Sequence, residues 1–177
     1  VKGKKEGEAN EWYETGILRM KCNYVNDMKE GEYKYWFATG QLYEHYHYVK
    51  GNLEGECKRW YGNGFLKEEC KYVNDKQEGE YKEWYDTGVP KEQYLYVKGD
   101  LGESKKWYEN GKLKEHCYSV NGKREGEYKS WYSNRTLQEH CFYVNDKLDG
   151  EYKLWYQNGK IHKHYQYKNG SLEGEFK

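Results

Sequence analysis

Aromatic and polar residues alternate along the chain in a pattern that returns about every two dozen residues. Glu80–Tyr85 reads Glu, Tyr, Lys, Glu, Trp, Tyr, and this aromatic density favours a β-strand. Leu113–Val120 predicts a second strand of the same kind of unit. No apolar stripe with the helical period survives, because a Gly recurs roughly every dozen residues. The pattern therefore predicts an all-β chain.

The repeated unit is clear in Gly126–Asp149, and copies of it follow one another along the chain. Units of 24 residues begin at Gly7, Gly31, Gly55, Gly102, Gly126 and Gly150, and one of 23 residues begins at Gly79. Partial units stand at both ends, in residues 1–6 and 174–177, and they favour a segment of a longer array over an array that stacks end to end. An internal period of this length is typical of repeat proteins, so residues 1–177 are predicted to form one repeat array.

Short turn sequences separate the predicted strands. Asn-Gly or Thr-Gly follows the first strand of a unit, as at Asn110-Gly111, and Asn-Asp, Asn-Gly or Lys-Gly follows the second, as at Asn26-Asp27. Asn-Gly between aromatic runs is a strong hairpin signal. Arg135 replaces the Gly in the sixth unit, so that turn is expected to be strained or differently built. The predicted fold is an elongated, single-layer antiparallel β-meander of 24-residue hairpin repeats, with about fourteen strands.

If both turns are two-residue loops, the register is fixed. Numbered from the Gly of each unit, positions 3, 5, 7, 12, 14, 16, 18 and 23 share the core side, here called face one. Positions 2, 4, 6, 13, 15, 17 and 19 share a mostly solvated side, called face two. Position 3 then lies opposite position 16, which gives the pairs Ala9–Cys22, Tyr33–Tyr46, Cys57–Cys70, Tyr81–Tyr94, Ser104–Cys117, Tyr128–Cys141 and Tyr152–Tyr165. Large and small pairs alternate through the first five units, as close packing requires.

Composition narrows the classes of function. With 22 Tyr and 7 Trp at fixed offsets and zero net charge, the chain is expected to be ordered around a tyrosine core. The 30 basic and 30 acidic residues argue against binding to nucleic acid and to anionic membrane surfaces. No apolar run is long enough for a transmembrane segment. Five Cys do not form a paired disulfide framework and favour a reducing, intracellular location, either cytoplasmic or within a viral particle.

The candidate chemical groups do not assemble a catalytic or metal site. All six His are predicted on face two, and His45 with His47, or His162 with His164, lacks a third ligand. Four Cys at position 16 are interpreted as small core residues. Cys57 and Cys70 are predicted to lie opposite each other, so this pair would form a disulfide under oxidation. Glu at position 2 and Lys at position 4 are interpreted as matched surface charges. We therefore expect no enzyme, no metal and no cofactor.

One Trp occupies position 6 of every unit, on the otherwise polar face two. The seven residues are Trp12, Trp36, Trp60, Trp84, Trp107, Trp131 and Trp155. One interpretation is that each ring packs on Lys stems and on neighbouring strands. The other is a row of aromatic anchors for a partner, because Trp dominates the energetics of many interfaces.

Gly-x-Tyr followed by aromatic residues, then x-Asn-Gly-x-Leu-x-Glu, resembles the MORN repeat, with its best instances in Gly102–Gly126 and Gly150–Gly174. The likeness is greatest to the variant form of bacterial proteins, some labelled antitoxin components, and of large DNA viruses of protists. The resemblance implies a grooved sheet of β-hairpins that serves as an interaction platform, in some members dimeric or attached to a catalytic domain. Lipid head-group binding has been attributed to some members. Lys-x-Trp-Tyr replaces the eukaryotic Gly-x-Trp pattern here, so eukaryotic ligand sites do not transfer.

Three hypotheses follow for the function. The leading one is a non-enzymatic structural or scaffolding protein, viral or bacterial, that binds a protein partner or itself along the sheet. The second is a module that binds carbohydrate or lipid head groups through its aromatic side chains. The third is an accessory repeat region of a larger enzyme or antitoxin.

Overall fold

The computed structural model describes residues 3–175, without the side chain of Glu175. Within this range the only regular elements are β-strands. The chain divides into two compact units, each larger than a single repeat: Val1–Gly88 is called the first unit from here on, and Val89–Lys177 the second. The outermost residues of the two predicted partial repeats, 1–2 and 176–177, lie outside the described residues.

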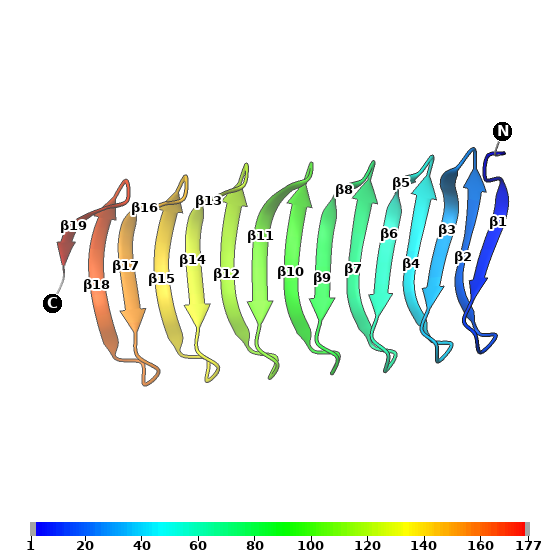
Figure 1. Ribbon diagram of the computed structural model, residues 1–177. Coiled ribbons are helices and arrows are strands. Elements are labelled where there is room, and N and C mark those ends of the chain that lie inside the picture. Colours follow the sequence, from blue (N-terminus) through cyan, green and yellow to red (C-terminus); the bar gives the residue numbers. More distant parts are fainter. Residues whose placement is uncertain (1–2, 176–177) are drawn as a thin grey trace. The chain divides into compact units, whose positions relative to one another are not determined.

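The first unit is an antiparallel meander in which each of the longer strands pairs with the longer strands next to it in the chain (Figure 1). Its strands are β1 (Gly7–Trp12), β2 (Leu18–Val25), β3 (Met28–Trp36), β4 (Leu42–Val49), β5 (Asn52–Leu53), β6 (Gly55–Trp60), β7 (Leu66–Val73), β8 (Lys76–Gln77) and β9 (Gly79–Trp84). β4 pairs with both β5 and β6, which together form one predicted strand interrupted at Glu54. Such interruptions raise the strand number above the fourteen expected.

The second unit repeats this arrangement. Its strands are β10 (Pro90–Val97), β11 (Asp100–Trp107), β12 (Leu113–Val120), β13 (Lys123–Arg124), β14 (Gly126–Trp131), β15 (Leu137–Val144), β16 (Lys147–Leu148), β17 (Gly150–Trp155), β18 (Ile161–Lys168) and β19 (Ser171–Glu175). All of the pairs within the unit are antiparallel. The predicted all-β class and antiparallel meander are therefore confirmed.

The first turn of each repeat differs from the prediction of a two-residue loop. The Tyr13 N–H donates to the carbonyl of Ile17 at 2.9 Å, and the Gly16 N–H donates back to the Tyr13 carbonyl at 2.9 Å. The loop therefore holds three residues and ends on Gly16, whose φ of 81° suits glycine. The register then shifts by one residue, because Glu11 lies opposite Met20 whereas Trp12 lies opposite Leu18. This β-bulge compensates for the loop and restores the predicted register further along the hairpin.

The bulge exchanges the faces of positions 12 and 13, so the prediction for these two positions was wrong. Leu18, at position 12, lines a face-two groove together with Trp36. Arg19, at position 13, instead donates from Nε to the Tyr35 hydroxyl of face one at 2.9 Å. His162, also at position 13, lies with its ring 4.2 Å from that of Tyr156. His162 therefore belongs to face one and not, as predicted, to face two.

The second turn is a two-residue loop, as predicted. Asn26 and Asp27 have φ angles of 52° and 68°, and Val25 pairs with Met28 across them. The register moves again near Gly31, where φ is 78°, since Asn23 faces Glu30 and Lys21 faces Lys34. At this second irregularity the pairing therefore moves by two residues. Because side chains alternate between the faces, a shift by two leaves every side chain on its original face.

The 23-residue repeat lacks the acidic residue that precedes Gly in the other units, because Leu101 is followed directly by Gly102. Here the register shifts by one residue only, between Tyr94 opposite Ser104 and Tyr96 opposite Leu101. A Cβ on Gly102 would lie 3.2 Å from the Leu95 carbonyl oxygen, so glycine permits this close approach. The smaller register shift in this repeat therefore compensates for its missing residue.

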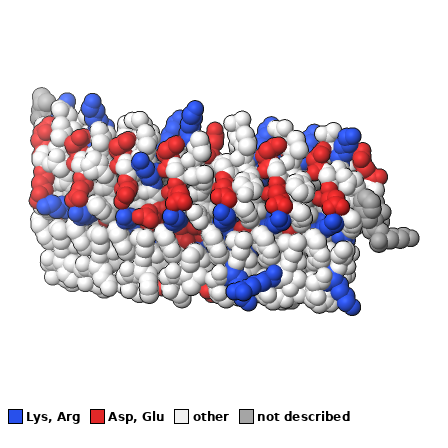
Figure 2. Space-filling model, turned by 180° about the vertical axis from the view of Figure 1, so that it is seen from behind, with Lys and Arg blue, Asp and Glu red and all other residues white. Residues whose placement is uncertain are grey.

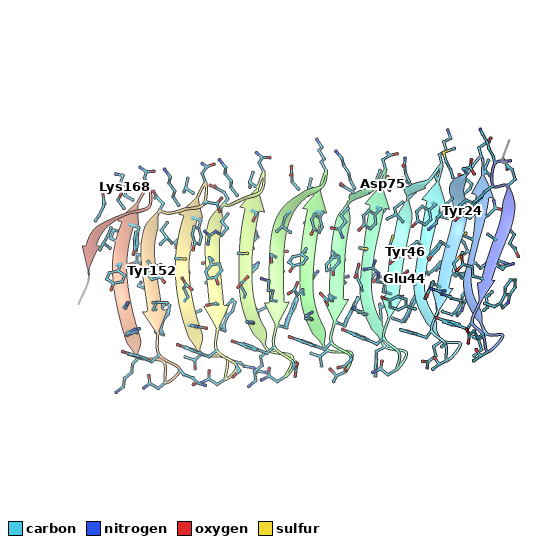
Figure 3. All side chains as sticks on the ribbon, viewed as in Figure 1. Tyr24, Glu44, Tyr46, Asp75, Tyr152 and Lys168 are labelled. Carbon is cyan, nitrogen blue, oxygen red and sulfur yellow. The ribbon has the colours of Figure 1, made fainter. Side chains whose placement is uncertain are left out.

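The predicted pairing of position 3 with position 16 is confirmed wherever both residues lie in one unit. These pairs are Ala9–Cys22, Tyr33–Tyr46, Cys57–Cys70, Ser104–Cys117, Tyr128–Cys141 and Tyr152–Tyr165. The small members of these pairs are buried on face one. They include Cys22, Cys57, Cys70, Ser104 and Cys141. Tyrosine rings pack between them, and the rings of Tyr33 and Tyr46 stack at 6.0 Å (Tyr46 is labelled in Figure 3).

Alkaline pH is expected to unfold the protein. Burial raises the pKa of Tyr33 and Tyr143 to about 12, because a tyrosinate there would lose its hydration. An unfolded Tyr has a pKa of about 10, so this stabilisation is complete below about pH 10 and is lost as pH rises towards 12. Circular dichroism and tyrosinate absorbance should therefore change together. A native sheet that persists after these tyrosines ionise would contradict the expectation, and Tyr33→Phe should move the transition to higher pH.

The turn at Arg135 is strained and not differently built. Arg135 has φ of 76°, and its N–H donates to the Tyr132 carbonyl at 2.9 Å, as the equivalent glycines do. Because this backbone conformation disfavours a Cβ, Arg135→Gly should raise the free energy of unfolding by about 1 kcal/mol. The matched reverse change, Gly159→Arg, should lower it by a similar amount. Chemical denaturation of both variants tests this, and an unchanged or less stable Arg135→Gly would refute it.

Candidate functional site

Each Trp of the predicted row is the last residue of its strand, on face two. Six of them pair directly with the apolar residue at position 12, in the pairs Trp12–Leu18, Trp36–Leu42, Trp60–Leu66, Trp107–Leu113, Trp131–Leu137 and Trp155–Ile161. We call the seven Trp with these position-12 residues the tryptophan face. Figure 2 shows face two, where rows of acidic and basic side chains adjoin a largely uncharged surface.

The tryptophan side chains are partly exposed. Trp12 is 59% exposed, and the other six are half-buried. Each half-buried ring thus contacts its own sheet and keeps part of its surface in solvent. The sequence located this row correctly on face two, but it misplaced the position-12 residues that accompany it.

The backbone carbonyls of several of these Trp accept a hydrogen bond from a Tyr hydroxyl of the preceding repeat. Tyrosines at position 7 donate to the Trp carbonyl of the next repeat at 2.8–2.9 Å, in the pairs Tyr13–Trp36, Tyr61–Trp84, Tyr108–Trp131 and Tyr132–Trp155. Phe37 occupies the same position in the second repeat and has no hydroxyl to donate. These hydrogen bonds were not predicted, although the recurring Trp-Tyr pair in the sequence is their signal. These bonds couple each Trp to the neighbouring hairpin.

A groove of about 650 Å³ lies on face two between the first two hairpins. Leu18 and Trp36 line one part of it. Its polar lining includes two ion pairs, Glu8–Lys21 at 2.9 Å and Glu32–Lys34 at 2.7 Å. The groove therefore combines an apolar surface with acidic and basic side chains that already form ion pairs with each other.

The Glu at position 2 and the Lys at position 4 form ion pairs, as the sequence indicated. The pairs are Glu32–Lys34, Glu56–Lys58, Glu80–Lys82, Glu103–Lys105, Glu127–Lys129 and Glu151–Lys153, at 2.6–3.1 Å. A hydrogen bond from Lys129 holds the pKa of the Glu127 carboxyl below its usual value. Exposed pairs of this kind contribute little stability each, and they match the charges of positions 2 and 4 with each other.

Four histidines join this charged surface at position 15. His45, His116, His140 and His164 each place Nε2 2.9–3.4 Å from the Glu at position 2. Among the described residues, no three metal-binding side chains gather where they could hold an ion. These histidines therefore act as hydrogen-bonding partners of the glutamates.

Cys57 and Cys70 lie directly opposite each other, at 1% and 4% exposure, and both thiols are free. A hydrogen bond between the thiols lowers the pKa of Cys57 and raises that of Cys70. Disulfide formation under oxidation remains a prediction.

The fold and this surface define a class: a β-hairpin repeat protein. A family model described as the MORN repeat variant matches residues 5–26, 29–50, 53–74, 77–98, 101–121, 124–145 and 148–169. The chain therefore belongs to the MORN repeat variant family. No curated protein matches the chain. Repeats of this family are generally non-catalytic and are associated with binding to proteins or membranes. No helix within residues 3–175 has the length and apolarity needed to span a membrane.

Proposed function

We propose that this chain is a non-enzymatic scaffolding protein of the cell interior that binds a protein partner through its tryptophan face. The observation that carries the proposal is the partly exposed Trp that lies opposite an apolar position-12 residue in six of the seven repeats. Trp is enriched among the few residues that supply most of the binding energy at protein interfaces. A regular row of such anchors suits an extended partner that crosses successive hairpins.

The electrostatics of face two favour a protein partner over an anionic membrane. The six Lys at position 4 are each paired with the Glu at position 2 of the same strand, and the whole chain has zero net charge. A membrane surface that binds through phosphate needs unpaired basic residues, each worth about 1 kcal/mol. The matched charges instead form a polar border beside an apolar contact, which is the usual anatomy of a protein interface.

The groove between the first two hairpins supports a second candidate, a binding site for carbohydrate or lipid head groups. Its volume of about 650 Å³ lies within the usual range for small-molecule sites. Trp36 would stack on a sugar ring or a quaternary ammonium group, while Lys21 and Glu32 would hydrogen-bond to it. This candidate needs one groove only, whereas the leading proposal needs the tryptophan face of more than one hairpin.

Substitution of Trp should separate these two candidates. Trp60→Ala lies outside the groove and should weaken partner binding by roughly 30-fold, the usual effect of losing an interface anchor. Trp12→Ala, at an exposed position, should weaken binding with little change in stability. Proteins captured by the wild-type chain, quantified by mass spectrometry and then bound in purified form, provide the measurement. Circular dichroism confirms that each variant is folded.

Raising salt from about 0.1 to 1 M should change partner binding by less than about threefold, because the contact is apolar and the charges are already paired. Equal capture by wild type, Trp60→Ala and Trp12→Ala would refute the proposal. Fluorescence shifts with choline, glycans or phosphoinositide vesicles that are lost only in Trp36→Ala would favour the groove.

A further inference from the structure

Face two carries a second apolar surface, away from the Trp residues and near the second turns of the hairpins. Position 17 holds an apolar residue in three consecutive repeats of the second unit, which are Leu95, Tyr118 and Phe142. These side chains are 37–40% exposed. The other repeats carry polar residues at this position, namely Asn23, His47, Lys71 and Gln166. The apolar residues are therefore a local feature of three repeats and not a requirement of the repeat fold.

A row of valines borders these residues on the side of the second turns. Val97, Val120 and Val144 follow two residues further along the same strands, so strand alternation places them on the same face. They are 42–56% exposed. We call these three valines and the three apolar position-17 residues the apolar strip. Contiguous exposed apolar surface marks a binding site more often than single exposed apolar residues do.

Histidines support the two aromatic rings of the apolar strip. The centre of the Tyr118 ring lies 4.8 Å from that of the His116 ring. The centre of the Phe142 ring lies 5.1 Å from that of the His140 ring. Each of these histidines in turn places Nε2 2.9 Å from the position-2 Glu of its repeat. The rings are therefore held in place before a partner binds, which lowers the entropic cost of binding.

Acidic residues at position 24 adjoin both aromatic residues. The Glu125 N–H donates to the Tyr118 carbonyl at 3.0 Å, and the Asp149 N–H donates to the Phe142 carbonyl at the same distance. Positions 17 and 24 share face two, because residues at both positions line the groove between the first two hairpins. Each of the two carboxylates accepts one backbone N–H from the second turn of the next repeat, and within residues 3–175 neither forms an ion pair. A negative charge without a cationic partner therefore lies beside each aromatic residue.

We propose that the apolar strip binds a basic amphipathic helix of a partner protein. Apolar side chains on one face of the helix cover the strip, and Lys or Arg side chains beside them lie against Glu125 and Asp149. The Glu and Lys rows at positions 2 and 4 separate the strip from the tryptophan face. The strip is therefore a docking surface in addition to that face and does not depend on it.

A helix suits this surface because the sheet has no backbone groups left to offer there. The Tyr118 and Phe142 carbonyls already accept hydrogen bonds within the sheet, so a segment that lies on the face must satisfy its own backbone. The strip residues recur at every second strand, about 9.6 Å apart. Seven residues of an α-helix rise about 10.5 Å, which is close to this spacing. A second copy of the chain suits the strip less well, since contact between two strips would bring like-charged carboxylates together.

The test titrates a synthetic helical peptide into the full chain and follows backbone NMR spectra. The peptide has three heptads, with Leu at the first and fourth positions of each heptad and Lys at the positions beside them. Shifts should centre on Leu95, Tyr118 and Phe142. Replacing the Lys of the peptide with Glu should weaken binding at least about tenfold. Raising salt from about 0.1 to 1 M should weaken binding of the Lys peptide roughly fivefold, which differs from the weak salt dependence expected at the tryptophan face.

Two variants of the chain test the apolar and the charged contacts separately. The first variant combines three substitutions: Leu95→Gln, Tyr118→Gln and Phe142→Gln. It should weaken peptide binding at least about tenfold. Gln166 occupies position 17 of the seventh repeat, so the fold accepts this residue there. The second variant, Glu125→Gln with Asp149→Asn, should weaken binding roughly fivefold and keeps the test valid if the first variant fails to fold.

The proposal is overturned if the peptide causes no local shift, if both variants bind it like wild type, or if the Glu peptide binds as tightly as the Lys peptide. Sedimentation of the chain alone tests the other occupant. A dimer that the three Gln substitutions dissociate would assign the strip to a second copy and would also overturn the proposal. Trp60→Ala should bind the peptide like wild type, so loss of a captured partner in that variant tests the tryptophan face alone.

Discussion

The β-bulge beside each Trp is the feature on which both faces depend. A three-residue loop closed by glycine would move the hairpin register by one residue, and a shift of one residue would send every side chain to the wrong face. The additional residue at the bulge restores the register, so tyrosines and small residues meet on face one along the rest of the hairpin. It also turns the position-12 residue towards Trp, which produces the tryptophan face.

The two faces use their aromatic residues differently. On face one, Tyr rings pack over buried Cys and Ser, and the Tyr128 hydroxyl donates a hydrogen bond to Glu115, at position 14 of its repeat. On face two, the Trp rings remain partly exposed while the Glu at position 2 and the Lys at position 4 pair with each other. One face therefore provides most of the packing, and the other provides apolar contact area that the hairpins themselves leave partly uncovered.

Much of the fold could be predicted because its signals are local. The period, the strands, the Asn-Asp and Asn-Gly turns and the pairing of position 3 with position 16 all follow from residues near one another in the sequence. The first loop was mispredicted because Asn-Gly and Thr-Gly were both taken as two-residue loops, whereas the dipeptide alone does not fix the length of the loop. The Tyr108 N–H donates to the Lys112 carbonyl around Asn110-Gly111, just as the Tyr13 N–H donates to the Ile17 carbonyl around Thr15-Gly16. Only Gly16 has positive φ in that loop.

The candidate sites were predictable to different degrees. The Trp row could be assigned to face two from strand alternation alone. Leu18 and His162 were misplaced because their faces depend on the bulge, and the bulge depends on the loop. The ion pairs of Arg59 with Glu44 and Glu68 were not predicted because the two glutamates come from two other strands, although Glu recurs at position 14 of the repeats.

The most direct test of this account is the register at the bulge, measured by cross-strand nuclear Overhauser effects in the folded chain. Contacts between the backbone of Trp60 and that of Leu66, with Cys57 opposite Cys70 in the same hairpin, are the predicted result. Contacts that place Trp60 opposite Lys67 with no bulge would contradict the account, because Leu66 would then leave the tryptophan face.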